Sequence, residues 1–187
     1  MLKDIFKDSI WYTSYKTDLN SFVQSYLQNN PVGRNVSNKG GYQSEDLNLT
    51  DPSLSTLVTY ITKQAHAYGN ALGYNTKNYI VSNMWLNVNN HKDYNEPHIH
   101  SGCVFAGIYY IDVKGNQGDT LLTRHDVSLR ELAFTNHSYN NPYTWSKVHL
   151  TPINHKCILF PAYQLHSVQP NTTKQPRVSL SFNILEG

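Results

Sequence analysis

Three histidines have the residue type and spacing to bind a metal. His98 and His100 lie two residues apart in the stretch NEPHIH, and His166 ends the stretch LFPAYQLH. On a strand, residues two apart point to the same face, so two strands could bring three imidazoles together. Three protein ligands with open positions are what a catalytic iron or zinc ion needs. The alternative is that these are ordinary polar histidines at strand ends.

The closing stretch RVSLSFN could place a cation beside those histidines. If it is a strand, Val178, Leu180 and Phe182 face one way, and the opposite face carries Arg177, Ser179 and Asn183. An inward arginine is costly unless it meets an anion, and its planar fork fits a carboxylate. Ser179 could add a hydrogen bond to the same group. The alternative is an edge-strand arginine in solvent.

Composition narrows the class of protein. Only 15% of the 187 residues are charged and the formal net charge is +2, so we do not expect a nucleic-acid-binding surface. No stretch approaches the roughly 20 apolar residues of a membrane span, and the first residues do not resemble a signal peptide. Two cysteines 54 residues apart do not form a disulfide framework. We expect a cytoplasmic protein that does not bind membranes.

The elements that must position these residues change character near residue 78. Helices are predicted at residues 21–30 and from Pro52 to Gly69 or Gly73, with Asp51 as the N-cap of the second. Short β-branched and aromatic segments follow, at residues 78–88, 103–113, 119–123, 147–152, 157–161 and 177–185. The sequence therefore predicts a mainly β (α+β) fold. One domain spans residues 1–187: a double antiparallel sheet of jelly-roll type at 78–187, with residues 1–77 as helical support packed on one sheet.

A series of motifs resembles the iron(II)/2-oxoglutarate-dependent oxygenase superfamily, within it a group found often in phages and marine bacteria. The series runs WLNVNN…HIHSGCVFAGIYYID…GDTLLTRHD…CILFPAYQLHSVQPNTTKQPRVSLSFN, about residues 80 to 184. The resemblance implies a double-stranded β-helix that uses Fe(II), 2-oxoglutarate and O2. It also implies a phage-encoded protein acting in the host cytoplasm.

The resemblance assigns roles to particular residues. His98 matches the first iron ligand and His166 the distal one. Arg177 matches the residue that binds the far carboxylate of 2-oxoglutarate, with Ser179 and Tyr110 beside it. Asn87 could bond the near carboxylate.

One departure from the family pattern leaves the third ligand open. His100 stands where a carboxylate is usual, so three neutral imidazoles would leave the iron site one unit more positive. His91 and Asp93 fit a His-x-Asp pattern literally but lie in the turn-like stretch NNHKDYNEP, whereas His98 and His100 head the strand at 103–113. Glu96 is a further option, because a residue two before His98 would share its face.

We expect a dioxygenase that hydroxylates a C–H bond of a peptide or small molecule and releases succinate and CO2. Two other functions stay open from the sequence. One is a cupin-like metalloenzyme with three histidines that needs no 2-oxoglutarate. The other is a non-catalytic jelly-roll module for binding or for a virion.

Overall fold

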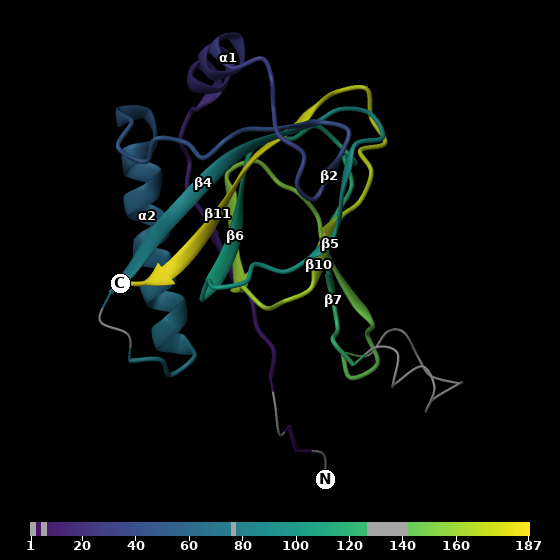
Figure 1. Cartoon of the computed structure of the whole chain (residues 1–187). Helices are drawn as coiled ribbons and strands as arrows, with labels where there is room; N and C mark the ends of the chain where they lie inside the picture. The colour runs from purple at the N-terminus through teal and green to yellow at the C-terminus, as the bar shows by residue number, and fades with distance from the viewer. Residues whose placement is uncertain (1–2, 5–6, 76–77, 127–141) are drawn as a thin grey trace.

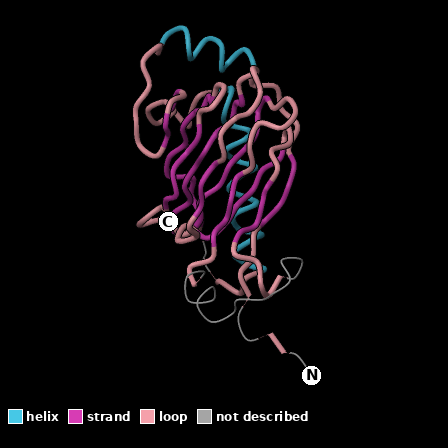
Figure 2. The backbone as a smooth tube through the Cα atoms, turned by 90° about the vertical axis from the view of Figure 1, so that its right-hand side faces the viewer, coloured by secondary structure: helices cyan, strands magenta, loops and turns pink. Residues whose placement is uncertain are grey.

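Two antiparallel sheets face each other in this computed structural model, which describes residues 3–4, 7–75, 78–126 and 142–187 (Figures 1 and 2). The larger sheet has the order β1 (Trp11–Ser14), β9 (Lys156–Pro161), β6 (Phe105–Asp112), β11 (Arg177–Glu186), β4 (Tyr79–Asn89), β3 (Tyr42–Gln43). The smaller sheet has the order β2 (Asn38–Lys39), β5 (Tyr94–His98), β10 (His166–Val168), β7 (Thr120–Thr123), β8 (Lys147–Leu150). The predicted jelly-roll class is confirmed.

Two helices precede the main strands, as predicted: α1 (Asn20–Asn29) and α2 (Pro52–Ala71). Asp51 caps α2 by accepting a hydrogen bond from the Ser53 amide at 2.8 Å, and Pro52 opens the helix. In Figure 1, α2 runs beside β4 on the outer side of the larger sheet. No helix in the described residues is long and apolar enough to cross a membrane.

The larger sheet separates two hydrophobic cores. The outer core joins α2 to the sheet and includes Leu54, Leu57, Ile61, Leu180 and Phe182, all with no exposed side-chain surface. The inner core lies between the sheets and is smaller; its buried members are Ala106, Ile108, Tyr110, Leu122, Leu150, Ile158 and Phe160. The inner space is therefore only partly filled by apolar groups, which leaves room for a polar pocket.

Strand β11 shows the predicted alternation. Val178, Leu180 and Phe182 join the outer core, together with Ile184. Arg177, Ser179 and Ser181 line a pocket between the sheets. β11 pairs with both β4 and β6, so it lies at the centre of the sheet and its inward side chains are held from both sides.

The strand carrying the first histidines differs from the prediction. The histidines do not head the strand at 103–113: His98 ends a separate strand, β5, and β6 begins only at Phe105. His100 lies in the connection between β5 and β6. β5 has exposed or half-buried residues throughout, including Pro97, so it lacks the apolar run that marks a strand in sequence.

Strand β1 is a further element that the sequence does not predict. Its four residues pair antiparallel with β9, from Trp11 opposite Leu159 to Ser14 opposite Lys156. Segments this short depend on a partner strand far away in sequence. The two cysteines are free; Cys157 is buried and Cys103 is half-buried.

Candidate metal centre and its pocket

The three histidines predicted as ligands come together in the lining of a pocket. Each offers a nitrogen, and the three nitrogens lie within 4.8 Å of one another. His98 and His166 are directly opposite in the β5–β10 ladder, and the Nε2 atoms of His100 and His166 are 3.2 Å apart. Strand pairing therefore brings residues 98 and 166 together, and the connection after β5 folds back to add His100.

Hydrogen bonds to the backbone fix the orientation of two of these rings. His98 Nδ1 is 2.7 Å from the carbonyl oxygen of Glu96, and His166 Nδ1 is 2.9 Å from that of Gln164. A carbonyl oxygen can only accept, so each Nδ1 carries the proton and each Nε2 keeps its lone pair. Metal-binding histidines are commonly held in this way. The donor set fits a divalent transition metal.

Burial keeps the three imidazoles neutral, which is the form that binds a metal. It lowers the pKa of His166 to about 3, assisted by the nearby His98, and it lowers the pKa of His98. The pKa of His100 falls to about 4, again through burial and then through His98. Within the described residues, the cluster consists of three histidines without a carboxylate.

The alternative ligands His91 and Asp93 lie outside this cluster. Asp93 follows the end of β4, where its Oδ2 accepts a hydrogen bond from the Asn90 amide at 2.7 Å. His91 Nδ1 lies 3.2 Å from the carbonyl oxygen of Thr173. These contacts tie the turn together, so both side chains have a structural role there.

Glu96 is turned away from the cluster by an irregularity in β5. His98 is opposite His166, yet Asn95 is opposite Val168, so three steps on β5 match two on β10. This β-bulge breaks the alternation on which the assignment of Glu96 depended. Asn95 consequently lines the pocket, while Glu96 forms an ion pair of 3.3 Å with Lys39 and has a side chain 49% exposed.

The pocket opens to solvent, and the empty space in it and at its mouth is about 500 Å³. It lies between the two sheets, and its lining combines the histidine cluster with all four residues predicted to bind a cosubstrate. The residues that line it include Trp85, Asn87, Asn95, His98, His100, Tyr110, Thr120, Phe160, His166, Arg177, Ser179 and Ser181.

Arg177 supplies a buried positive charge in this pocket. It is 2% exposed, and its Nη1 donates to the carbonyl oxygens of Gln117 and Gly118 at 2.6 and 2.9 Å. Among the described residues it forms no ion pair, and its other nitrogens donate no hydrogen bond. Burial lowers its pKa, while nearby Tyr110 and Asp119 act in the opposite direction. A buried guanidinium with unused donors favours an anion as its partner.

The remaining predicted residues add hydroxyl and amide groups to the lining of the same pocket. The hydroxyl oxygens of Tyr110 and Thr120 are 3.0 Å apart, and Asn87 Nδ2 donates to Ser181 Oγ at 3.0 Å. Burial raises the pKa of Tyr110, so its hydroxyl stays protonated and can donate. Thr120 and Ser181 were not predicted, although Ser181 follows the same alternation as Arg177 and Ser179.

The family described as "Putative 2OG-Fe(II) oxygenase" matches residues 83–183 of the chain, a segment that contains all the pocket residues named above. Among curated proteins, none matches the chain in sequence.

Solved structures resemble the fold. A Pseudomonas putida prolyl-4-hydroxylase aligns with a TM-score of 0.68 at 9% identity, covering 96% of this chain and 94% of the other. SnoN, a non-heme alpha-ketoglutarate-dependent epimerase from nogalamycin biosynthesis, aligns at 0.65 with 16% identity, covering 96% and 79%. HygX from Streptomyces hygroscopicus, with nickel and 2-oxoglutarate bound, aligns at 0.60 with 11% identity, covering 95% and 82%. At these identities the likeness concerns the fold.

Proposed function

This chain belongs to the 2OG-Fe(II) oxygenase family, and from that premise we propose that it is a dioxygenase that hydroxylates a C–H bond of a peptide or small molecule. The family's cofactors are Fe(II) and 2-oxoglutarate. The similar fold of a prolyl-4-hydroxylase supports hydroxylation of a peptide or amino-acid carbon, whereas the similar fold of SnoN belongs to an epimerase. Membership of the family gives the oxygenase chemistry, and we add to it the hydroxylation of a C–H bond.

The observation that carries the proposal is the position of Arg177. A protein that only bound a metal through three histidines would have no use for a buried guanidinium in the same pocket. Arg177 is almost fully buried and has no described carboxylate partner, so a dianion with one carboxylate at the metal and the other at Arg177 would satisfy both groups that line the pocket. 2-Oxoglutarate is such a dianion.

In this proposal, His98, His100 and His166 hold Fe(II) through their Nε2 atoms. Three neutral ligands leave the full charge of the metal in place, and a pocket that is more positive attracts an anionic cosubstrate more strongly. His91, Asp93 and Glu96 stay outside the ligand set, because their side chains are engaged elsewhere.

The residues around Arg177 orient the cosubstrate. Arg177 binds the far carboxylate with its free donors, and Tyr110 and Ser179 add hydroxyl groups to the same carboxylate. Asn87 bonds the near carboxylate. Bound together, Fe(II) and 2-oxoglutarate supply the oxidising chemistry that consumes O2, releases succinate and CO2, and cleaves the substrate C–H bond. Trp85 and Phe160 line the same pocket and reduce the access of water to it.

A metalloenzyme that needs no 2-oxoglutarate is the second candidate, and it is favoured because the histidine cluster contains no carboxylate from the described part of the chain. The two candidates differ in one requirement. A three-histidine enzyme of this second kind would take up O2 with its substrate alone, and Arg177 would have no anion to bind.

Product analysis separates these candidates from a non-catalytic binding module. The protein is reconstituted with Fe(II) and given O2 with and without 2-oxoglutarate, and succinate and O2 uptake are measured. The proposal predicts succinate only in the presence of 2-oxoglutarate, including a slow uncoupled turnover without the primary substrate. O2 uptake that does not need 2-oxoglutarate would support the second candidate. Tight Fe(II) binding without succinate, across candidate peptides and small molecules, would contradict the proposed function.

A further inference from the structure

His100 differs from the other two histidines of the cluster in the group that holds its Nδ1, the ring nitrogen that does not face the cluster. His98 and His166 are fixed by backbone carbonyl oxygens. His100 has its Nε2 toward His166, and its ring stacks on that of Trp85 with the centroids 5.9 Å apart. Trp85 is opposite Ser181 in the β4–β11 ladder, and Asn183 follows two residues later on the same face, near His100. In keeping with this position, the Asn183 side chain raises the pKa of His100 against the larger effect of burial. Asn183 Oδ1 is buried and accepts no hydrogen bond from the residues that the structure describes. An orphaned acceptor thus lies beside the ring that stands where a carboxylate is usual.

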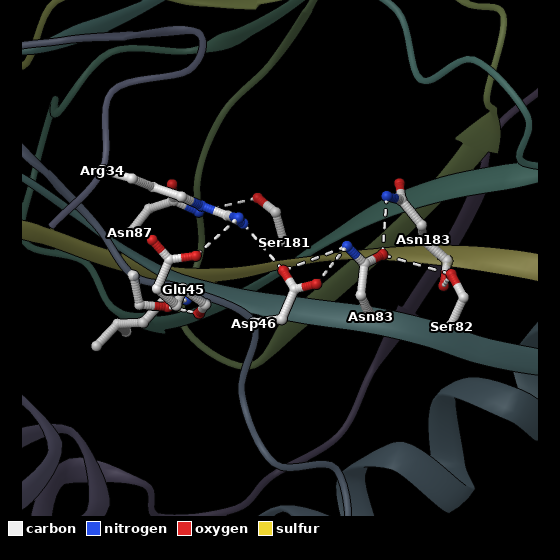
Figure 3. Close-up of polar contacts among 10 residues, drawn as sticks. Arg34, Glu45, Asp46, Ser82, Asn83, Asn87, Ser181 and Asn183 are labelled. Carbon is white, nitrogen blue, oxygen red and sulfur yellow. Dashed lines mark hydrogen bonds and ion pairs between the residues drawn. The ribbon is translucent and has the colours of Figure 1, made fainter.

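A chain of hydrogen bonds fixes which way the Asn183 amide points (Figure 3). Asp46 is a carboxylate, which only accepts, and Asn83 Nδ2 donates to its two oxygens at 3.3 and 3.2 Å. Asn83 Oδ1 must then point the other way, and it accepts from Asn183 Nδ2 at 2.9 Å. Because the amino group of Asn183 donates to Asn83, the amide oxygen of Asn183 points away from Asn83.

The sheet holds this chain of groups in register. Asn83 and Asn183 are direct partners in the β4–β11 ladder. Asp46 lies in the segment after β3 and is itself held by Arg34, whose Nη2 is 2.9 Å from Asp46 Oδ1. Asp46, the first residue in this series of hydrogen bonds, lies at the protein surface, since its side chain is 50% exposed.

We propose that Asn183 is a positioning residue for the metal site, and that its Oδ1 accepts the Nδ1 proton of His100. That bond selects the tautomer whose Nε2 lone pair faces the metal. Asp46 acts at a distance by setting, through Asn83, the orientation of the Asn183 amide. The inference rests on the proposed role of the three histidines as ligands.

The arrangement gives His100 a partner similar to the backbone carbonyls of the other two rings. It also places the negative charge of Asp46 at the far end of this series of hydrogen bonds, separated from His100 by the amides of Asn83 and Asn183. Groups that hold the outer nitrogen of a metal-bound histidine typically contribute 10- to 100-fold to metal affinity. Asn183 is thus expected to matter for metal binding although it touches no metal.

Two substitutions of Asn183 separate positioning from packing. Asn183→Leu keeps the approximate shape and removes both polar groups, so we expect Fe(II) to bind roughly 10- to 100-fold more weakly. Asn183→Asp keeps an acceptor beside His100 but loses the donor to Asn83. If Asn183 positions His100, the aspartate variant retains most of the wild-type affinity. If Asn183 only supports the sheet, both variants lose affinity alike.

Asp46 offers a test with a matched control on the neighbouring residue. Asp46 and Glu45 both form ion pairs with Arg34, but only Asp46 accepts from Asn83. Asp46→Asn lets the amides of Asn83 and Asn183 turn over, so Fe(II) affinity should fall, by less than in Asn183→Leu. Glu45→Gln should leave it unchanged. This pair stays informative even if the Asn183 variants fold poorly, because both residues are largely exposed.

The measurement is anaerobic Fe(II) titration against a chromophoric chelator, together with the ¹⁵N shifts of His100 in the Zn(II)-loaded protein, which report the tautomer. Loss of affinity in Asn183→Leu and Asp46→Asn, with recovery in Asn183→Asp and no change in Glu45→Gln, is the expected pattern. Wild-type affinity and an unchanged His100 tautomer in Asn183→Leu would overturn the inference. A wild-type protein that binds no Fe(II) would instead overturn the proposed function.

Discussion

The two faces of β11 differ in polarity and in what they contact. One face carries Val178, Leu180 and Phe182 into the core beneath α2, where it is sealed and apolar. The other carries Arg177, Ser179 and Ser181 into the pocket, with Asn183 next along the same face. Both sets sit on one backbone, held by the same ladder to β4 and β6.

The difference shows how a jelly roll supports a polar site. Hydrophobic burial against the helix stabilises the sheet, so the inner face need not contribute much to stability. The inner face is free to hold Arg177 without an ion pair among the described residues and the unpaired acceptor Asn183 Oδ1, which cost stability but prepare the site for an anion and a metal. The comparison predicts that substitutions on the two faces have separable effects.

The largest expected effect is on the helix side. Phe182→Ala removes a fully buried ring that closely contacts Gly107, where a Cβ atom would lie 2.4 Å from the ring. We expect the free energy of unfolding to fall by about 3–5 kcal/mol, because a cavity is left in a packed core. Urea denaturation measures this, with Ser181→Ala as the neighbouring control on the pocket side. Comparable losses in the two variants would break the distinction between the faces.

The second-largest effect is expected on the pocket side of β11, where a substitution should weaken the binding of 2-oxoglutarate. Arg177→Met keeps the length and apolar stem but removes the charge, so the dissociation constant of 2-oxoglutarate should rise roughly 30-fold to several thousandfold, equivalent to about 2–5 kcal/mol. Calorimetry on the anaerobic Fe(II)-loaded protein measures it. Arg124→Met is the control, because Arg124 pairs with Asp126 and does not line the pocket. Equal 2-oxoglutarate binding in both variants would remove Arg177 from the site.

The smallest effect is expected for Glu96, a possible metal ligand whose carboxylate points away from the histidine cluster. Glu96 lies two residues before His98, but the β5 bulge turns it toward Lys39 and solvent. Glu96→Gln should change the free energy of unfolding by less than about 1 kcal/mol, since exposed ion pairs contribute little. Fe(II) affinity should stay at the wild-type value in the same titration. A tenfold loss of affinity would return Glu96 to the ligand set.

How far the sequence could predict this molecule follows from the same comparison. The alternation in RVSLSFN and the cap at Asp51 are local signals, and both were confirmed. Strand β1 has no such signal, because four residues gain their stability only by pairing with β9.

The site was predictable in its residue types but less so in its geometry. The two-residue spacing predicts that Glu96 lies on the same face of the strand as His98. The pairing of β5 with β10 contains a bulge, and as a result Asn95 lines the pocket and Glu96 does not. The orientation of Asn183 depends on Asp46, 137 positions earlier in the chain, through a contact that no local pattern encodes.

A crystal structure of the protein with Fe(II) and 2-oxoglutarate, prepared without oxygen, tests the central claim most directly. The proposed function predicts iron bound by Nε2 of His98, His100 and His166, with the far carboxylate of 2-oxoglutarate on the Arg177 guanidinium. Iron bound by the carboxylate of Asp93 or Glu96 in place of His100, or 2-oxoglutarate bound away from Arg177, would contradict it.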